Sequence, residues 1–270
     1  MPHATGVDYR GGGVMTRSTL ASNDMIGRYL FGLAAIAFGI CVLVFHSFNP
    51  WQRFDWLGNI PHQEILLNIV ATTQILGGIA IQWQRTARAG AMALGGLYLL
   101  FALHWLPLYG QKPLVYGRLG SFFEQFSMVS GALIVYASMD RQPSRAATLA
   151  RIGYYGFGIS VISFALQQLF YLQDTAELVP TWIPPSQMFW AIATTIAFAL
   201  AAIAILTGRS ALLASRLLTL MIVGFGILIW VPASFADPRS MTNWAANAEN
   251  FGIAGAAWIV AGYLKNKRFT

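Results

Sequence analysis

The strongest constraint on the fold is a spaced pattern that occurs twice in the chain. It reads W-x-P-x5-P-x10-E-x-F, and its two copies begin 125 residues apart. Each copy joins the end of one long apolar segment to the start of the next, so the pattern predicts an internal duplication of a multi-helix unit. Its members are Trp105, Pro107, Pro113, Glu124 and Phe126 in the first copy and Trp230, Pro232, Pro238, Glu249 and Phe251 in the second.

The composition predicts that this unit lies in a membrane. Hydrophobic residues make up 56% of the chain and charged residues only 10%, with a mean hydropathy of +0.56. A soluble domain carries roughly 25% charged residues. Since lipid offers the backbone no hydrogen-bond partners, spanning segments must be helices or closed barrels. The apolar segments here have the length of helices, so the predicted fold class is all-α, a polytopic membrane protein.

Eight apolar segments approach the roughly 20 residues that a helix needs to cross a bilayer. They are 27–47, 64–83, 87–107, 119–138, 152–172, 186–207, 211–232 and 244–264. Four segments in each half predict two fused parallel four-helix bundles with eight transmembrane helices. The expected organisation is a disordered cytoplasmic tail (1–25), a first membrane repeat (26–139), a cytoplasmic linker (140–151) and a second membrane repeat (152–265).

The basic residues predict the orientation of the chain. With the N-terminus inside, 13 of the 17 Lys and Arg residues fall on the inner side and 4 on the outer side. Positive charge collects on the cytoplasmic side of membrane proteins, so both termini are expected there. The net charge of +7 is spread over segment ends rather than gathered in one patch, which argues against nucleic-acid binding. The single cysteine, Cys41, excludes an intrachain disulfide and a thiolate metal site.

Two stretches resemble the DoxX-like membrane family. RYLFGLAAIAFG, from Arg28 to Gly39, is similar to that family's first helix, and TQILGGIAI, from Thr73 to Ile81, to its second. Gln74 stands where the family often has an acidic residue, and the matching stretch 199–205 of the second half has neither the polar residue nor the glycines.

The resemblance covers about 27–264 and implies a four-helix unit in a bacterial cytoplasmic membrane. Family members include a subunit linked to thiosulfate and quinone oxidation. The resemblance therefore implies an accessory or redox-linked component, close to a quinone, another apolar small molecule or a membrane-protein partner.

Glu124 and Glu249 are the strongest candidates for chemistry, because each is an acid inside an apolar segment. An ionisable group at the centre of a bilayer costs at least ~2.5 kcal/mol, so such residues usually face other helices or a wet cavity. One interpretation is a symmetry-related pair that lines an outward-facing pocket and takes up a proton or binds a polar head group. The other is structural, because a negative charge near a helix N-terminus is favoured by roughly 0.3–1 kcal/mol.

Three aromatic residues lie close to these acids in the expected topology. His104 would act with Glu124, since a neutral imidazole can bind a metal or carry a proton. The second half has Ile229 in its place, and no His-x3-His or carboxylate–histidine spacing predicts a metal site. Trp105 and Trp230 fit either the aromatic belt at the headgroup level or the walls of an amphiphile pocket above the glutamates.

Gln74 and Asn250 are polar residues within the expected spans. Hydrogen bonds between membrane helices average about 0.6 kcal/mol, so these side chains either join helices or line a cavity. No motif names a reaction or a cofactor. Two alternatives to the accessory role therefore stay open, a transporter of small molecules or lipids, which the repeat suggests, and a non-catalytic assembly partner.

Overall fold

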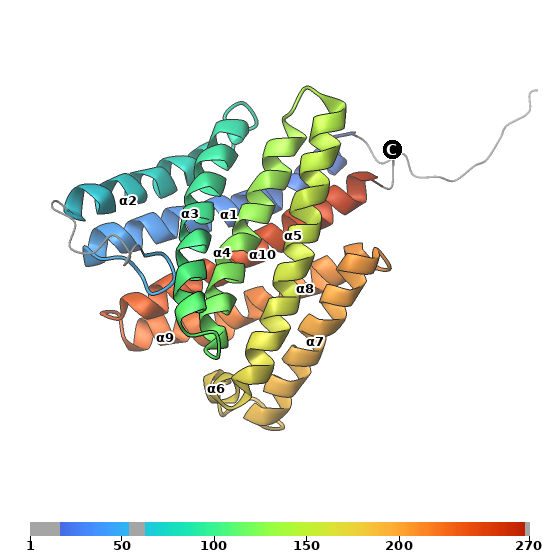
Figure 1. Ribbon diagram of the computed structural model, residues 1–270. Coiled ribbons are helices and arrows are strands. Elements are labelled where there is room, and N and C mark those ends of the chain that lie inside the picture. The colour runs from blue at the N-terminus through green and yellow to red at the C-terminus, as the bar shows by residue number, and fades with distance from the viewer. Residues whose placement is uncertain (1–16, 54–62, 268–270) are drawn as a thin grey trace, which may run out of the picture.

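The computed structural model describes residues 17–53 and 63–267, and within these ranges it is all-helical and contains no strand (Figure 1). This confirms the all-α fold class. The elements are α1 (Arg17–Phe45), α2 (Gln63–Ala80), α3 (Ala87–Gln111), α4 (Tyr116–Ser138), α5 (Pro143–Phe170), α6 (Leu172–Leu178), α7 (Gln187–Thr207), α8 (Ala211–Phe225), the π-helical segment η2 (Gly226–Trp230), α9 (Val231–Ala236) and α10 (Met241–Lys267).

Each predicted apolar segment falls on one of these helices, with α8, η2 and α9 running on as one. Two boundaries differ from the expectation. Helix α1 begins at Arg17, inside the segment expected to be a disordered tail, and residues 1–16 lie outside the described residues. Helix α5 begins at Pro143, inside the expected linker, because proline is well suited to the first turn of a helix.

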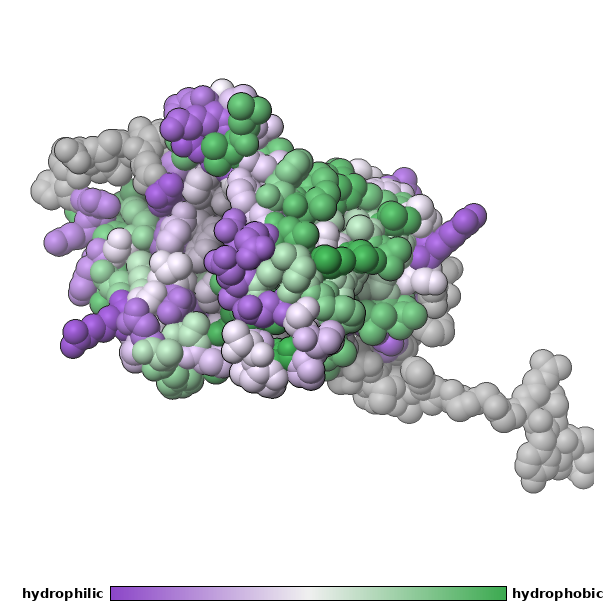
Figure 2. Space-filling view, turned by 90° about the horizontal axis from the view of Figure 1, so that it is seen from below, coloured by the Kyte–Doolittle hydropathy of each residue, from purple (hydrophilic) through white to green (hydrophobic). Residues whose placement is uncertain are grey.

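Among the residues that the structure describes, five helical segments are long and apolar enough to cross a membrane, which indicates a membrane protein. They are Met25–Phe45, Ala87–Gln111, Pro143–Phe170, Gln187–Thr207 and Ala211–Ala236. Large apolar side chains stand exposed along α7 and α8, among them Leu200 and Leu220. Figure 2 shows hydrophobic side chains gathered over a broad area, with hydrophilic ones beside them. A soluble monomer rarely exposes so much apolar surface, whereas lipid would cover it.

The three other long helices, α2, α4 and α10, are not among these five. Each carries a buried polar side chain, namely Gln74 on α2, Gln125 on α4 and Glu249 on α10. A helix that packs mainly against other helices need not be as apolar as one that faces lipid. The crossing of the membrane by all eight long helices stays a prediction.

The central helices are α4 and α10, which contact each other. Helix α10 packs against α1 and α8, and α4 packs against α3 and α5, so that α1 and α10 lie side by side (Figure 1). The first long helix of each half therefore packs on the last long helix of the other half. The helices do not separate into two independent bundles. They form two lobes that share α4 and α10.

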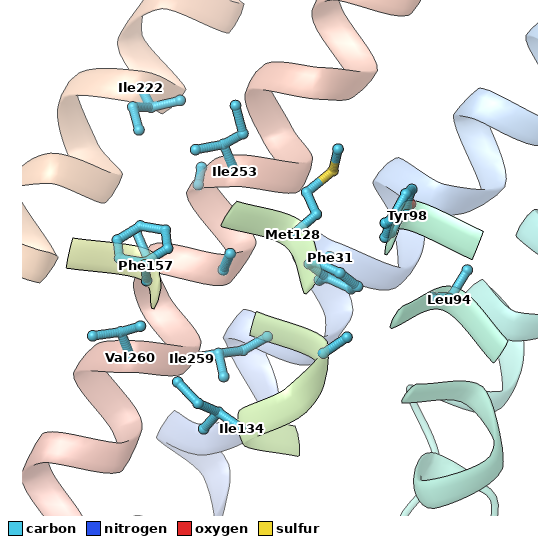
Figure 3. Close-up of a cluster of buried hydrophobic side chains, with 14 of the residues drawn as sticks. Phe31, Leu94, Tyr98, Met128, Ile134, Phe157, Ile222, Ile253, Ile259 and Val260 are labelled. Carbon is cyan, nitrogen blue, oxygen red and sulfur yellow. The ribbon is translucent and has the colours of Figure 1, made fainter. Parts of the chain in front are cut away.

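Buried side chains from both halves meet around the central helices (Figure 3). Phe31 of α1 and Phe157 of α5 are almost fully buried, and Met128 and Val260 bring in α4 and α10. The main core thus crosses the boundary between the halves, and a small separate cluster of Val42, Leu67 and Ala71 lies between α1 and α2.

Two kinds of contact between helices occur in both lobes, and the first is a close approach at a glycine. Gly27 of α1 packs on Ile259 of α10, where an added Cβ would lie 2.9 Å from the backbone nitrogen. Gly153 of α5 packs on Ile134 of α4, where an added Cβ would lie 2.9 Å from Cγ1. Glycine allows this close approach of two membrane helices.

A second recurring contact fixes the first helix of each half to the end of the next one. Arg28 Nε donates to the carbonyl oxygen of Ile81 over 2.8 Å, and the Tyr154 hydroxyl donates to the carbonyl oxygen of Ile205. By contacts, Tyr154 is therefore the counterpart of Arg28. Arg151 of α5 matches Arg28 in residue type but is exposed.

Candidate functional site

A chain of three buried glutamine side chains runs through the first lobe and ends on Glu249. Gln74 Nε2 donates to Gln52 Oε1 over 2.6 Å, and Gln52 Nε2 donates to Gln125 Oε1 over 3.2 Å. Gln125 Nε2 then donates to Glu249 Oε1 over 2.8 Å. All four side chains are at most 5% exposed. They come from α2, the α1–α2 connection, α4 and α10, so the chain joins elements that are far apart in the sequence.

The glutamines are oriented alike, because every amide nitrogen points along the chain toward Glu249. Oε1 of Glu249 accepts the last of these hydrogen bonds, and the amide oxygens of Gln52 and Gln125 each accept from the amide nitrogen of the preceding glutamine. Aligned hydrogen bonds in a low-dielectric interior strengthen one another. The chain therefore forms one polar unit whose acceptor end is the Glu249 carboxylate.

The α1–α2 connection holds Gln52 in place. The Asn49 side-chain oxygen accepts hydrogen bonds from the backbone nitrogens of Trp51, over 3.0 Å, and Gln52, over 2.9 Å. Its nitrogen donates to Gln52 Oε1 over 3.2 Å. In this turn both polar side chains are fully buried, and the Gln52 amide that links α2 to α4 is held in position.

Glu124 is oriented differently from Glu249. Its Oε1 accepts a hydrogen bond from Gln167 of α5 over 3.0 Å, and its Oε2 is buried without a hydrogen-bond partner in the described part of the chain. Gln125, which follows Glu124 along α4, donates to Glu249 of α10, so both acids lie near the α4–α10 contact. The structure thus brings the two acids to the same region but gives each its own glutamine donor from a different helix.

His104 and Trp105 lie at the end of α3, beneath the α1–α2 connection. Both are buried, and their rings pack edge to face with centroids 5.5 Å apart. Trp105 Nε1 donates to the carbonyl oxygen of Trp51 over 3.0 Å, and the Arg53 guanidinium lies 5.1 Å from the centroid of the Trp105 ring. Trp105 is therefore enclosed by protein rather than exposed on the lipid-facing surface.

Trp230 has different surroundings. It lies in the π segment and lines a depression of about 410 Å³ together with Glu177, Trp182 and Asn243. None of the glutamines that lead to Glu249 lines this depression. Asn250 likewise stays local, because its nitrogen donates to the carbonyl oxygen of Ala246 in the same helix over 2.9 Å. The structure therefore brings Gln74, Glu124 and Glu249 into one region and leaves Trp230 apart.

A groove of about 710 Å³ lies between α1 and α10. Its wall is almost wholly apolar, and the exception on α10 is Asn247, whose Oδ1 is buried without a hydrogen-bond partner in the described chain. The α1 wall runs from Leu30 to Phe45, which at 1.5 Å per residue is about 22 Å. The lining residues are Leu30, Leu33, Ala34, Ala37, Ile40, Cys41, Val44, Phe45, Pro238, Trp244, Asn247, Ala248 and Phe251.

The sequence alone did not predict three residues of these sites, namely Gln52, Gln125 and Asn247. Gln125 follows Glu124 inside an apolar segment, and that position was a usable signal. Gln52 lies in a connection and Asn247 near a helix end, where polar residues are common. In the described residues no group of three His, Cys, Asp or Glu side chains is placed to hold a metal ion.

Comparison with known proteins adds no family assignment. No protein-family model, curated protein or solved structure matches this chain.

Proposed function

We propose that this protein is a multi-pass, DoxX-like protein of the bacterial cytoplasmic membrane that holds an apolar small molecule in the α1–α10 groove. A quinone or a lipid has the tail that such a groove fits, and an accessory role beside a redox partner would follow from a bound quinone. The observation that carries the proposal is the groove itself, which is long, apolar and open on one side.

The size and chemistry of the groove favour a ligand with a tail. Small-molecule sites usually enclose about 300–1,000 Å³ and combine an apolar wall with a few polar groups. Here the wall is apolar over about 22 Å of α1, and Asn247 is the polar side chain of the α10 wall. A long apolar tail would therefore run along α1.

The corresponding place in the other lobe is filled by the chain itself. Phe122 and Phe123 of α4 stand 125 positions before Asn247 and Ala248 of α10. Their rings pack together with centroids 4.9 Å apart. An open groove is therefore not a necessary result of packing these helices. We attribute it to Ala248, which stands 125 positions after Phe123.

The tandem-repeat organisation belongs to the same proposal. It is supported by the contacts of Gly27 and Gly153 and by the hydrogen bonds of Arg28 and Tyr154. A further argument is the π segment, because a single extra residue in a helix is commonly absorbed as a π turn.

The spacing between α3 and α8 changes at that segment. Before it, buried Leu94 and Tyr98 of α3 match buried Leu218 and Ile222 of α8 at a spacing of 124. After it, Trp105 matches Trp230 at a spacing of 125. One residue inserted in the second copy accounts for both spacings.

The orientation also remains a proposal, with both termini in the cytoplasm. Helix α1 begins and α10 ends at the same end of the molecule (Figure 1). The basic residues of the α4–α5 connection and of the end of α10 belong to the side with most of the positive charge, as expected for the cytoplasmic face.

The test is retention of a native ligand. The protein is purified in a mild detergent, and bound molecules are identified by native mass spectrometry and by solvent extraction. Ala248→Phe places on α10 the ring that Phe123 supplies on α4, and Ala37→Phe narrows the groove from α1. Leu220→Phe adds a ring at a lipid-exposed position outside the groove and serves as the control.

We expect the wild type and Leu220→Phe to retain one tailed molecule and both groove variants to lose it. Retention by a folded Ala37→Phe variant, or no bound molecule in the wild type, contradicts the proposal. Co-purification of another membrane protein without any tailed ligand favours the assembly role. Uptake of a solute into vesicles that depends on Glu249 favours the transporter.

A further inference from the structure

We propose that the depression over Trp230 binds an ammonium group, in the place that the chain's own Arg53 takes over Trp105. The site is independent of the groove, because the two share no lining residue. The ligand class is an ammonium-bearing molecule, either the head group of a lipid or a free compound such as choline.

The first lobe shows what a tryptophan at this position accepts. The Arg53 guanidinium lies 5.1 Å from the centroid of the Trp105 ring, within the range of a cation–π interaction. Arg53 lies in the described part of the connection between α1 and α2, two residues after Trp51, whose carbonyl oxygen accepts from Trp105 of α3. In this lobe the cation is part of the protein.

The second lobe lacks that cation but keeps the indole. The connection between α5 and α7 contains α6 and supplies Glu177 and Trp182 instead of an arginine. In the described residues no Lys or Arg side chain lies over the Trp230 ring, although two such contacts occur elsewhere in the chain. The position over the indole is therefore left to an external group.

The lining has the chemistry that an ammonium group requires. Two indoles, Trp182 and Trp230, share the depression with the Glu177 carboxylate, which is the one charged side chain among the residues that line it. Indole faces attract ammonium ions, and aromatic sites for choline-like ligands use several rings. The carboxylate supplies the matching charge, so an anionic ligand is disfavoured.

The local backbone also sets this lobe apart. One wall of the depression is formed by the π segment, which contributes its residues from Ile227 to Trp230. π turns occur frequently at functional sites, because they turn side chains away from the regular helical positions. Trp182 is 71% exposed, which leaves a large aromatic face open to a ligand.

The experiment measures ammonium binding to the detergent-purified full chain. Choline chloride and tetramethylammonium chloride are titrated by calorimetry, with sodium chloride at equal concentration as the salt control. In a second arm, the protein is placed in nanodiscs of phosphatidylcholine or of phosphatidylglycerol, and lipid retained after delipidation is identified by mass spectrometry. The first arm detects a free ammonium ligand and the second a lipid head group.

The variants separate the proposed site from general binding to indoles. Trp230→Leu and Glu177→Gln should each weaken binding by about 3- to 10-fold, whereas Trp230→Phe, which keeps an aromatic face, should weaken it less. Trp83→Leu removes another exposed indole outside the depression and should leave binding unchanged.

Saturable binding in the first arm, or retained phosphatidylcholine in the second, with this order of variants supports the proposal. The proposal is overturned if the first arm shows no saturable binding and the second no retained phosphatidylcholine, or if Trp83→Leu and Trp230→Leu cause equal loss. The latter result would mean that exposed indoles bind the probe at the interface without a specific site. A negative result in this experiment does not bear on the proposed ligand of the α1–α10 groove, because the test of that ligand uses different variants.

Discussion

In the α4–α5 and α1–α10 interfaces, the first long helix of one half packs on the last long helix of the other half. The two interfaces differ in the side chains that α4 and α10 carry there. On α4, the Phe122 and Phe126 rings stack with centroids 5.4 Å apart, Phe123 packs against both, and Phe126 lies against Gly156 of α5. On α10, the residues 125 positions after Phe122 and Phe123 are Asn247 and Ala248, and both line the apolar groove. The comparison suggests side-chain volume at these positions as the difference to test.

The same comparison explains why the two acids have different partners. In the spacing that matches Gly27 with Gly153, Gln167 corresponds to Cys41. Gln167 donates to Glu124, whereas the Cys41 thiol lines the groove and cannot replace that amide donor. Glu249 accepts its hydrogen bond from Gln125 of α4 instead. Two residues at equivalent positions of a pattern therefore belong to different networks.

The largest predicted effect tests whether the two lobes share one core. Phe31→Ala and Phe157→Ala each remove a ring that is almost fully buried, so each should lower the free energy of unfolding by about 3–5 kcal/mol. Denaturant unfolding in a fixed detergent measures both. A loss from one variant that is less than half the loss from the other would show that the lobes are not energetically equivalent.

The next effect separates the two carboxylates. Glu249→Ala leaves the buried Gln125 amide without its acceptor, which should destabilise the protein by about 1–3 kcal/mol. Glu124→Ala should have less effect, because Glu124 and Gln167 are only partly buried. The unfolding assay described above ranks the two variants. An equal loss of unfolding free energy in both variants would contradict a difference between the two networks.

A smaller change should make the filled interface resemble the open one. Phe123→Ala removes a partly buried ring from α4 and should destabilise the protein by about 1–2 kcal/mol. It should also open a second apolar cavity, detected as an additional bound lipid or detergent molecule by native mass spectrometry. Leu220→Phe is again the control for a surface change. An unchanged ligand count in a folded Phe123→Ala variant would show that the interface closes around the missing ring.

The smallest effect lies in the α4–α5 connection, which has no counterpart between α10 and α1. Arg145 donates two hydrogen bonds to Asp140, of 2.6 and 3.0 Å, and lowers the pKa of that carboxyl. The stabilisation is present above the ordinary pKa of aspartate and is lost as the pH falls through the lowered value. Asp140→Asn should therefore slightly flatten the dependence of the unfolding temperature on pH below the ordinary pKa of aspartate, which thermal unfolding at a series of pH values measures. An unchanged pH dependence would contradict a contribution from this ion pair.

The sequence predicted the helices better than the sites. An apolar run of about 20 residues is a local property, so each of the eight predicted segments lies on a helix of the described chain. The fixed spacing of 125 residues held after the π segment and failed before it, where buried Leu94 and Leu218 are 124 apart. A single insertion inside an apolar run leaves no signal in hydropathy.

The sequence by itself determined an all-helical chain with the composition of a membrane protein and two acids placed alike in a repeated pattern. Only the tertiary structure decided that Gln52, Gln74 and Gln125 lead to Glu249, and that the groove is open beside Ala248 while Phe123 fills its counterpart. The physical reason is that helix formation depends on neighbours along the chain. A hydrogen-bonded network or a cavity depends on donors, acceptors and volumes contributed by helices far apart in the sequence.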